Sequence, residues 1–167
     1  MRILAICGSL QAKSSNLTLL RHAQASSPVG VQVELYDGLG KLPHFNPDLE
    51  RDGSPSVITE LRQAVLTSDA LLIAMPEYGH SLPGSLKNAI DWLIGTGELE
   101  GKLVAITSAV AGPLRGKLGL AALRATLGAV SARIAFQEPI ARGLSFEEDI
   151  AEMLRLLVAA GSSRTTP

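Results

Sequence analysis

Three short segments of this sequence carry the small and polar residues from which a ligand site can be built. The first is Gly8–Asn16 (GSLQAKSSN), which follows an apolar run and precedes a helical apolar pattern. Its side-chain hydrogen-bond donors are Ser9, Ser14, Ser15 and Asn16. A loop of this kind directs backbone N–H groups and the positive end of a helix dipole at one point, which suits a phosphate group. The alternative is that the polar residues only cap the helix, and the loop alone leaves both interpretations open.

The first segment matches neither of the two common nucleotide-binding patterns. It lacks the glycine that precedes the lysine of a Walker A sequence, and it lacks the glycine spacing of a G-x-G-x-x-G fingerprint. A nucleoside triphosphate and a standard dinucleotide fold are therefore disfavoured.

The second segment is Pro76–Ser81 (PEYGHS), which lies between a buried apolar run and a helix start. Pro76 ends the preceding strand, whereas Pro83 suits the first turn of a helix, where no backbone N–H is needed. Ligands of open α/β sheets bind outside the carboxyl ends of the strands, so this segment is the first candidate for a site. The third segment, Ser108–Gly116, follows another apolar run and is rich in small residues that allow a ligand to approach the backbone.

The composition excludes several classes of protein. The chain has 167 residues and a formal charge of −1, without a basic stripe, so neither nucleic acid nor an anionic membrane surface is an expected partner. No apolar run approaches the roughly 18 residues of a membrane span, and the first residues already read as a strand instead of a signal peptide. We therefore expect one domain, a cytoplasmic location and no metal site. The single Cys7 ends an apolar run and is predicted to be a small buried side chain.

Apolar runs and helical periodicities alternate along the chain. The predicted strands are Arg2–Cys7, Val31–Tyr36, Leu71–Met75, Lys102–Thr107 and Ala132–Phe136. Helical patterns follow each of them, and the last helix is expected over Phe146–Ala160. Ser54 with Pro55 predicts one helix start, and Ser145 with Glu148 predicts another through a capping box.

This alternation predicts a flavodoxin-like three-layer α/β/α sandwich with a five-stranded parallel sheet in the order 2-1-3-4-5. The three polar segments follow strands 1, 3 and 4, which are neighbours in that order, so one crevice can be lined by all three. We expect a single flavodoxin-like domain over residues 1–160 and a frayed tail over 161–167. The long segment Asp37–Pro55 is predicted as a functional or interface loop, in which His44 and Phe45 hold the loop down.

The first and second segments together resemble the NADPH-dependent FMN reductase family, a flavodoxin-like group that includes chromate, quinone and azo-dye reductases. The resemblance runs from Ile3 to about Gly112. The matching residues are Gly8-Ser9-Leu10, Ser14, Asn16, Pro76-Glu77-Tyr78, Ser81, Pro83-Gly84, Leu86-Lys87-Asn88-Ala89 and Asp91-Trp92.

The resemblance implies a bound FMN. The family role of the first loop is to hold the FMN phosphate, that of the second is to wrap the isoalloxazine and ribityl groups, and that of the third is to approach the opposite ring edge. The residues expected to bind the cofactor are Ser9, Gln11, Ser14, Ser15, Asn16, Pro76, Glu77, Tyr78, Gly79, Ser108, Ala109 and Gly112. Two positions depart from the family: Gln11 stands where an arginine is usual, with Lys13 nearby, and Gly79 stands where asparagine is common.

The implied reaction is a ping-pong transfer from NADPH or NADH to FMN and then to a quinone, azo, metal-oxyanion or flavin acceptor. Because the flavin carries the chemistry, no catalytic acid or base is predicted; Glu77 is expected to orient its loop and His80 to be structural. Two alternatives stay open, a non-enzymatic electron carrier and a flavin-free scaffold domain. The resemblance also implies a homodimer or homotetramer through the helix that contains Asp91 and Trp92, although simple packing at the surface would explain them as well.

Overall fold

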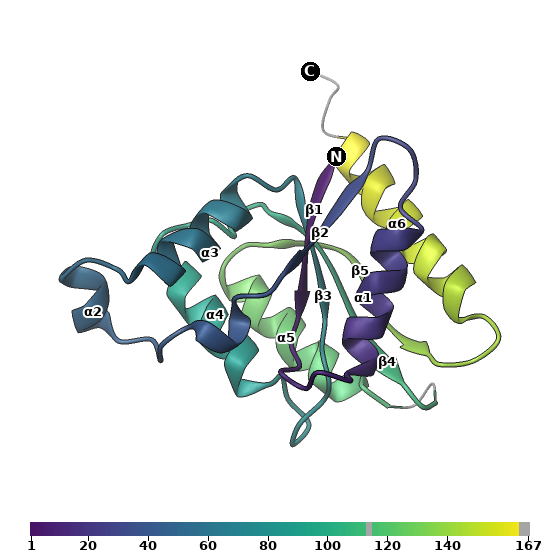
Figure 1. Ribbon diagram of the computed structural model, residues 1–167, viewed down its shortest axis with the longest axis horizontal. Coiled ribbons are helices and arrows are strands. Elements are labelled where there is room, and N and C mark those ends of the chain that lie inside the picture. Colours follow the sequence, from purple (N-terminus) through teal and green to yellow (C-terminus); the bar gives the residue numbers. More distant parts are fainter. Residues whose placement is uncertain (113–114, 164–167) are drawn as a thin grey trace.

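A twisted parallel sheet forms the centre of the computed structural model, which describes residues 1–112 and 115–163 (Figure 1). Its strands are β1 (Arg2–Cys7), β2 (Gln32–Tyr36), β3 (Ala70–Ala74), β4 (Leu103–Val110) and β5 (Arg133–Ala141). They lie in the order β2-β1-β3-β4-β5, and every neighbouring pair is parallel. The predicted flavodoxin-like order is therefore confirmed.

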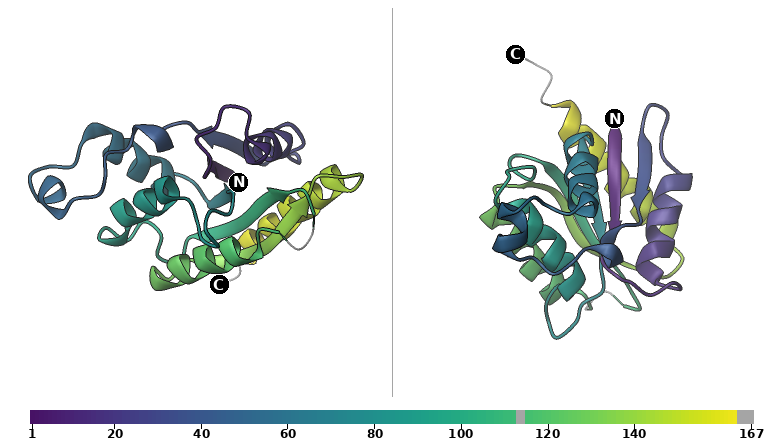
Figure 2. Two further views of the ribbon diagram at one scale, coloured as in Figure 1. Left: turned by 90° about the horizontal axis from the view of Figure 1, so that it is seen from below. Right: turned by 60° about the vertical axis from the view of Figure 1, so that its left-hand side comes forward.

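Helices cover both faces of the sheet and complete the three layers. They are α1 (Ser15–Ala25), α2 (Pro47–Arg51), α3 (Ser56–Leu66), α4 (Gly84–Ile94), α5 (Lys117–Ala129) and α6 (Phe146–Ser162), with a short 3₁₀ helix η1 (Leu39–Lys41). Figures 1 and 2 show α1 and α6 side by side on one face, with α3, α4 and α5 on the other. The short helix α2 stands away from the sheet.

The central strand β3 is buried on both faces, as its unbroken apolar sequence predicts. Leu71 and Ile73 belong to the core under α3, α4 and α5, whereas Leu72 belongs to the core under α1 and α6. Successive side chains of a strand point to opposite faces, so a strand with a helix layer on each side favours apolar residues at every position.

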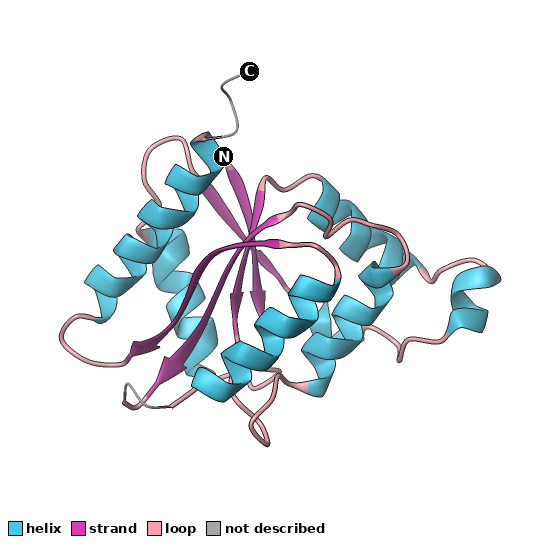
Figure 3. Cartoon of the chain, turned by 180° about the vertical axis from the view of Figure 1, so that it is seen from behind, coloured by secondary structure: helices cyan, strands magenta, loops and turns pink. Residues whose placement is uncertain are grey.

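Strands β4 and β5 are longer than predicted. The apolar pattern suggested ends at Thr107 and Phe136, but pairing continues to Val110 and Ala141. The view from behind shows these two strands running together (Figure 3). Strand pairing depends on backbone hydrogen bonds, so small residues do not interrupt it where the backbone groups find partners. Ser108 and Ala109 therefore lie in β4 and not in the following loop. That loop includes residues 113–114, which lie outside the described residues.

Two predicted helix starts are wrong in detail. Pro55, not Ser54, holds the N-cap position of α3, because the Ser54 hydroxyl accepts a hydrogen bond from Arg62 Nη1 at 3.0 Å. Ser145 is the N-cap residue of α6, but its hydroxyl donates to Asp149 Oδ2 at 2.9 Å and no capping box forms.

The last helix is also longer than predicted. It runs to Ser162, beyond the expected end at Ala160, and Gly161 lies close to the Met1 side chain, where a Cβ would come within 3.0 Å of Cε. Residues 164–167 of the predicted tail lie outside the described residues.

Helix α4 holds the long segment between β2 and α3. Asn88 accepts from the Phe45 N–H at 2.7 Å and donates to the Pro43 carbonyl at 2.9 Å, and Trp92 Nε1 donates to the same carbonyl at 2.9 Å. The Phe45 and Trp92 rings pack edge to face with centroids 5.1 Å apart. Phe45 therefore holds the loop down as predicted, whereas His44 is exposed.

The same contacts correct one argument for a subunit interface. Trp92 is fully buried (0% exposed) within its own chain. Its indole N–H, which would suit a half-exposed contact with a partner, is already used by the Pro43 carbonyl. Trp92 is thus a residue of the core.

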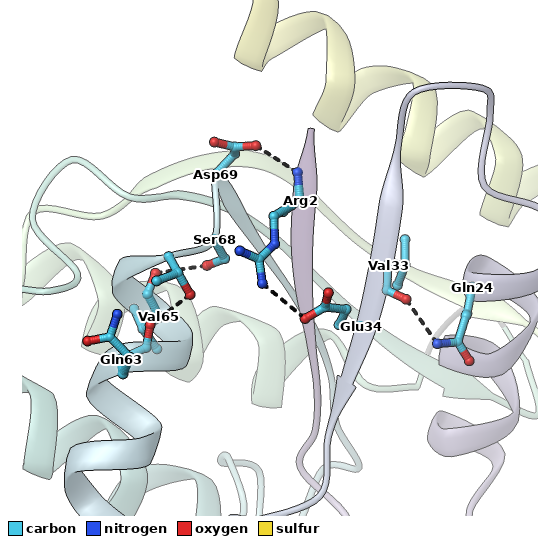
Figure 4. A network of polar contacts seen from close by, with 9 residues as sticks. Arg2, Gln24, Val33, Glu34, Gln63, Val65, Ser68 and Asp69 are labelled. Atoms are coloured by element: carbon cyan, nitrogen blue, oxygen red, sulfur yellow. Dashed lines mark hydrogen bonds and ion pairs between the residues drawn. The ribbon is translucent and has the colours of Figure 1, made fainter.

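Hydrogen bonds at the amino-terminal edge hold the first strands together (Figure 4). The Arg2 backbone N–H donates to Asp69 Oδ2 at 2.6 Å, and its guanidinium lies 3.4 Å from Glu34 Oε2. On the other side of β2, Gln24 Nε2 donates to the Val33 carbonyl at 2.9 Å. These contacts stabilise the starts of β1, β2 and β3, so the carboxyl ends of the strands remain free to form a site.

Candidate functional site

A cavity of about 510 Å³ lies at the carboxyl ends of the strands. It is lined from the start of α1, the loop after β3, the end of β4 and the residue after β5. The predicted site residues that line it are Asn16, Pro76, Glu77, Ser108 and Ala109. The structure thus brings together residues from all three polar segments of the sequence.

The remaining predicted residues lie outside this lining, namely Ser9, Gln11, Ser14, Ser15, Tyr78, Gly79 and Gly112. Other lining residues were not predicted, among them Arg115, Leu118 and Arg142. Arg142 follows β5 directly, and an apolar pattern that ended five residues before the true end of β5 gave no indication of its position.

A larger cavity of about 640 Å³ lies elsewhere, between α3 and the starts of β1 and β2. Its charged lining residues include Arg2 and Glu34, which pair with each other. Because it lies near the amino end of β1, away from the polar segments, we take the smaller cavity as the candidate site.

Asn16 connects the first loop to β4 and also faces the cavity. Its Oδ1 accepts from the Ala109 N–H at 2.8 Å, which fixes the orientation of the amide. Within the described part of the chain, Nδ2 has no hydrogen-bond partner, although the residue is only 4% exposed. Two N–H donors are therefore held at the cavity wall, ready for a polar ligand.

The other polar residues of the first loop have different partners. The Ser14 hydroxyl accepts from the Asn16 N–H at 3.2 Å and caps α1, so capping explains Ser14. The Ser9 hydroxyl accepts from the Gln11 N–H at 3.3 Å, and the Gln11 side chain is exposed. The Ser15 hydroxyl accepts from Arg142 Nη1 at 3.2 Å.

Ser108 adds a second buried polar group to the cavity. It is 2% exposed, and its hydroxyl has no partner among residues 1–112 and 115–163. The chain at residue 116 passes close to the Ser108 hydroxyl, which favours glycine, since a Cβ on Gly116 would stand 3.2 Å from Ser108 Oγ. The neighbouring Ala109 N–H, by contrast, is used by Asn16 and is not available to a ligand.

Glu77 connects the loop after β3 to the start of α5. Its Oε2 accepts from the Gly119 N–H at 2.8 Å, and Oε1 lies 3.3 Å from His80 Nδ1. The hydrogen bond from Gly119 is the main reason why the pKa of Glu77 lies below its ordinary value, and the His80 contact adds to it. The carboxylate is thus held as an anion against the helix start, which agrees with the expectation that Glu77 orients its loop.

The loop after β3 reverses through a tight turn. Tyr78 and Ser81 exchange two backbone hydrogen bonds of 3.0 Å, and the two residues between them have positive φ, 56° at Gly79 and 61° at His80. Positive φ at both central residues defines a type I′ turn. The turn projects the Tyr78 side chain outward, where it is 58% exposed.

The model of one protein family, NADPH-dependent FMN reductase, matches residues 1–141. The chain belongs to this family. The resemblance found in the two loop motifs is therefore confirmed, and the match extends past the fourth strand, where the motifs are weaker.

Relatives within the family have related activities in their names. An NAD(P)H-dependent FMN reductase from Pseudomonas aeruginosa is 40% identical over 114 residues, which are 67% of this chain and 61% of the relative. An NADPH:quinone oxidoreductase from Arabidopsis thaliana is 42% identical over 96 residues, or 55% of this chain and 48% of the relative. The chain thus spans about half to three fifths of the length of these relatives.

Solved structures agree in fold. FerB from Paracoccus denitrificans, a flavoenzyme NAD(P)H:(acceptor) oxidoreductase, superposes with a TM-score of 0.75 at 27% identity, covering 97% of this chain and 95% of FerB. An NADH:FMN oxidoreductase in its apo form gives a TM-score of 0.70 at 23% identity, which supports the fold alone.

The described residues contain neither a metal-binding cluster nor a membrane-spanning helix. No group of three or more His, Cys, Asp or Glu side chains in residues 1–112 and 115–163 is arranged to hold a metal ion. Over the same residues, no helix combines the length and apolar character needed to cross a membrane.

Proposed function

We propose that this chain is an NAD(P)H-dependent FMN reductase, which binds FMN in the cavity at the carboxyl ends of β1, β3 and β4. Family membership supports the activity. The observation that carries the proposal for this site is that two side chains lining one cavity, Asn16 and Ser108, have hydrogen-bonding groups, Nδ2 and Oγ, without a protein partner in the described chain. Both groups are accessible from the cavity, so a polar ligand bound there can form hydrogen bonds with them.

The residues present fit FMN in their chemistry. The cavity is bounded by the start of α1, whose dipole and free N–H groups favour a phosphate. In the proposed complex Ser9, Ser15 and Asn16 would hold the phosphate, and the Pro76–Gly79 and Ser108–Gly112 segments would hold the ring. Bound FMN supplies the redox chemistry, since its ring can accept a hydride from NADPH or NADH and pass electrons to an acceptor.

The protein residues have binding and orienting roles in this scheme. Asn16 and Ser108 fix the cofactor through hydrogen bonds, and Glu77 holds the loop after β3 at a constant distance from α5. The exposed Tyr78 ring stands at the outer side of that loop, where a planar nicotinamide or quinone can stack on it. No side chain is needed as a catalytic acid or base, and we propose that the donor and the acceptor use one open site in turn, in a ping-pong mechanism.

An anaerobic absorption spectrum of FMN-reconstituted protein tests the proposal. We expect the bound flavin to bleach when NADPH or NADH is added and to regain its colour when a quinone follows. If flavin binds but stays oxidised with both donors, the protein is an electron carrier. If no flavin binds, only the scaffold alternative is left.

We further propose that the chain forms a homodimer or homotetramer through the outer face of α4. Lys87 and Asp91 form an ion pair on that helix, and Ile94 at its end is 52% exposed, so the helix offers charged and apolar groups together. Light scattering of wild type and Ile94→Asp tests this: a smaller particle for the variant supports the α4 interface, and an unchanged mass contradicts it.

A further inference from the structure

A nearby cation strengthens phosphate binding, and the residue at position 11, where the family usually has an arginine, is glutamine in this chain. Gln11 is exposed and carries no charge. Lys13, the nearest cation in the sequence, is also exposed and makes no side-chain contact in the described structure. The first loop by itself therefore holds no positioned positive charge.

The structure places a guanidinium at this loop from the other end of the chain. Arg142 Nη1 donates to the hydroxyl of Ser15, the first residue of α1, at 3.2 Å. Arg142 also lines the cavity together with Asn16, whose Nδ2 has no hydrogen-bond partner in the described chain. Two elements far apart in the sequence, α1 and the end of β5, thus contribute hydrogen-bond donors to one cavity.

The backbone of Arg142 is well anchored, whereas its charge is not neutralised. Its N–H donates to the Val110 carbonyl at 2.8 Å, which extends the pairing of β5 with β4 by one residue. Within the described residues, no carboxylate lies at ion-pair distance from the guanidinium, which uses only one of its five N–H donors there. A guanidinium with free donors beside a helix start is suited to a phosphate dianion.

We propose that Arg142 binds the 5′-phosphate of FMN and takes the place of the arginine that the family usually has at position 11. This inference rests on the proposed function, because it assigns a residue to the cofactor of that site. A fixed backbone and a planar fork favour Arg142 over Lys13, whose flexible point charge would lose more side-chain freedom on binding.

Comparison of FMN with riboflavin, which lacks the phosphate, isolates the contact. We expect Arg142→Gln to raise the Kd of FMN by about tenfold or more while the Kd of riboflavin is unchanged. Quenching of flavin fluorescence on addition of apoprotein measures both constants without any turnover. Adding Gln11→Arg to the Arg142→Gln variant should restore most of the FMN affinity, because it returns a guanidinium to the first loop.

Arg21→Gln is the matched control, since it removes the same charge from an exposed position near the far end of α1 and should leave both constants unchanged. Equal FMN affinity in wild type and Arg142→Gln would overturn the inference while leaving the proposed function intact. An equal loss of FMN and riboflavin affinity would also overturn it, since the phosphate would not be the group contacted. Wild-type protein that binds neither flavin would refute both proposals.

Discussion

Asn16 uses the two ends of one amide for two purposes. The oxygen joins α1 to β4 through the Ala109 N–H, and the nitrogen faces the cavity. Oδ1 therefore has a structural role and Nδ2 a proposed binding role. The sequence motif alone cannot separate these two roles of Asn16.

Replacing Asn16 with aspartate separates these roles. A carboxylate oxygen still accepts from Ala109, and a negative charge is favourable near the start of α1, so we expect little change in melting temperature. The two amide donors are lost and a phosphate is repelled, so the Kd of FMN should rise by about tenfold or more.

Flavin fluorescence titration and thermal unfolding of the same samples measure both effects. Asn16→Ala serves as the comparison, because it also removes the acceptor of Ala109 and should lower the free energy of unfolding by about 1–3 kcal/mol. Wild-type FMN affinity in Asn16→Asp would mean that Nδ2 does not contact the cofactor.

Glu77 gives a second prediction at the scale of a single residue, in this case a dependence on pH. A carboxyl group whose pKa is lower in the folded than in the unfolded protein stabilises the fold above its ordinary pKa of 4.5, and that contribution is lost as the pH falls through the folded value. Wild type should therefore exceed Glu77→Gln in free energy of unfolding by about 1 kcal/mol at pH 7. The difference should shrink below pH 4.5.

Urea unfolding between pH 7 and pH 3 or so measures this difference. Glu100→Gln is the control, because Glu100 is exposed and its side chain makes no contact in the described residues, so it should match wild type throughout. A Glu77→Gln deficit that stays constant with pH would show that the carboxylate charge is not what stabilises α5.

The pairing of Tyr78 with Ser81 determines the shape of the loop between β3 and α4. Only two residues separate Tyr78 from Ser81, and a type I′ turn closes so short a connection. That geometry suits Gly79, and it would also suit asparagine, since both residues tolerate positive φ.

The turn predicts different effects for two substitutions at Gly79. Alanine should lower the free energy of unfolding by about 1 kcal/mol because its φ of 56° is unfavourable for a residue with a Cβ. Asparagine should cost less, because its side chain tolerates the left-handed region. Neither substitution clashes, since a Cβ at Gly79 would meet nothing within 4 Å.

Equilibrium unfolding in urea measures these differences, provided that the slope of free energy against urea concentration is the same for each variant. If Gly79→Ala is as stable as Gly79→Asn, the turn does not hold its type I′ geometry in solution.

At the scale of the whole molecule, Arg62 connects segments that are far apart in the sequence. Its Nη2 donates to Glu50 Oε1 at 2.5 Å and to the Trp92 carbonyl at 3.0 Å, and its Nε lies 3.6 Å from Glu98 Oε1. Glu98 is only 8% exposed and also accepts from Thr96. One guanidinium thus joins α2, α3, α4 and the link to β4.

Arg62→Met should lower the free energy of unfolding by about 3 kcal/mol, since it leaves the buried Glu98 carboxylate without its cation. Arg51→Met is the matched control, because Arg51 pairs with Asp48 at the surface and such pairs contribute less than about 1 kcal/mol. Chemical unfolding of the two variants measures both losses. If the two variants lose equal free energy of unfolding, the partly buried contacts of Arg62 contribute no more to stability than the surface pair of Arg51.

The sequence by itself determined the alternation of strands and helices, the strand order and the two loop motifs of the family. These features follow from local patterns: β3 is apolar throughout because both its faces are buried, and the first loop combines small residues with helix-capping ones. Trp92 shows the limit, because its type suggested a surface contact and its environment made it a core residue.

Only the tertiary structure decided which groups meet in the cavity. β4 and β5 extend past their apolar runs because each supplies hydrogen-bond partners to the other, and a residue's own sequence neighbours do not reveal such pairing. That extension puts Ser108 in a strand and brings Arg142 to the start of α1, 127 residues away from Ser15 in the chain. Contacts over such separations depend on how the strands pair in the sheet. The position of the Arg142 guanidinium beside the first loop was therefore visible only in the folded chain.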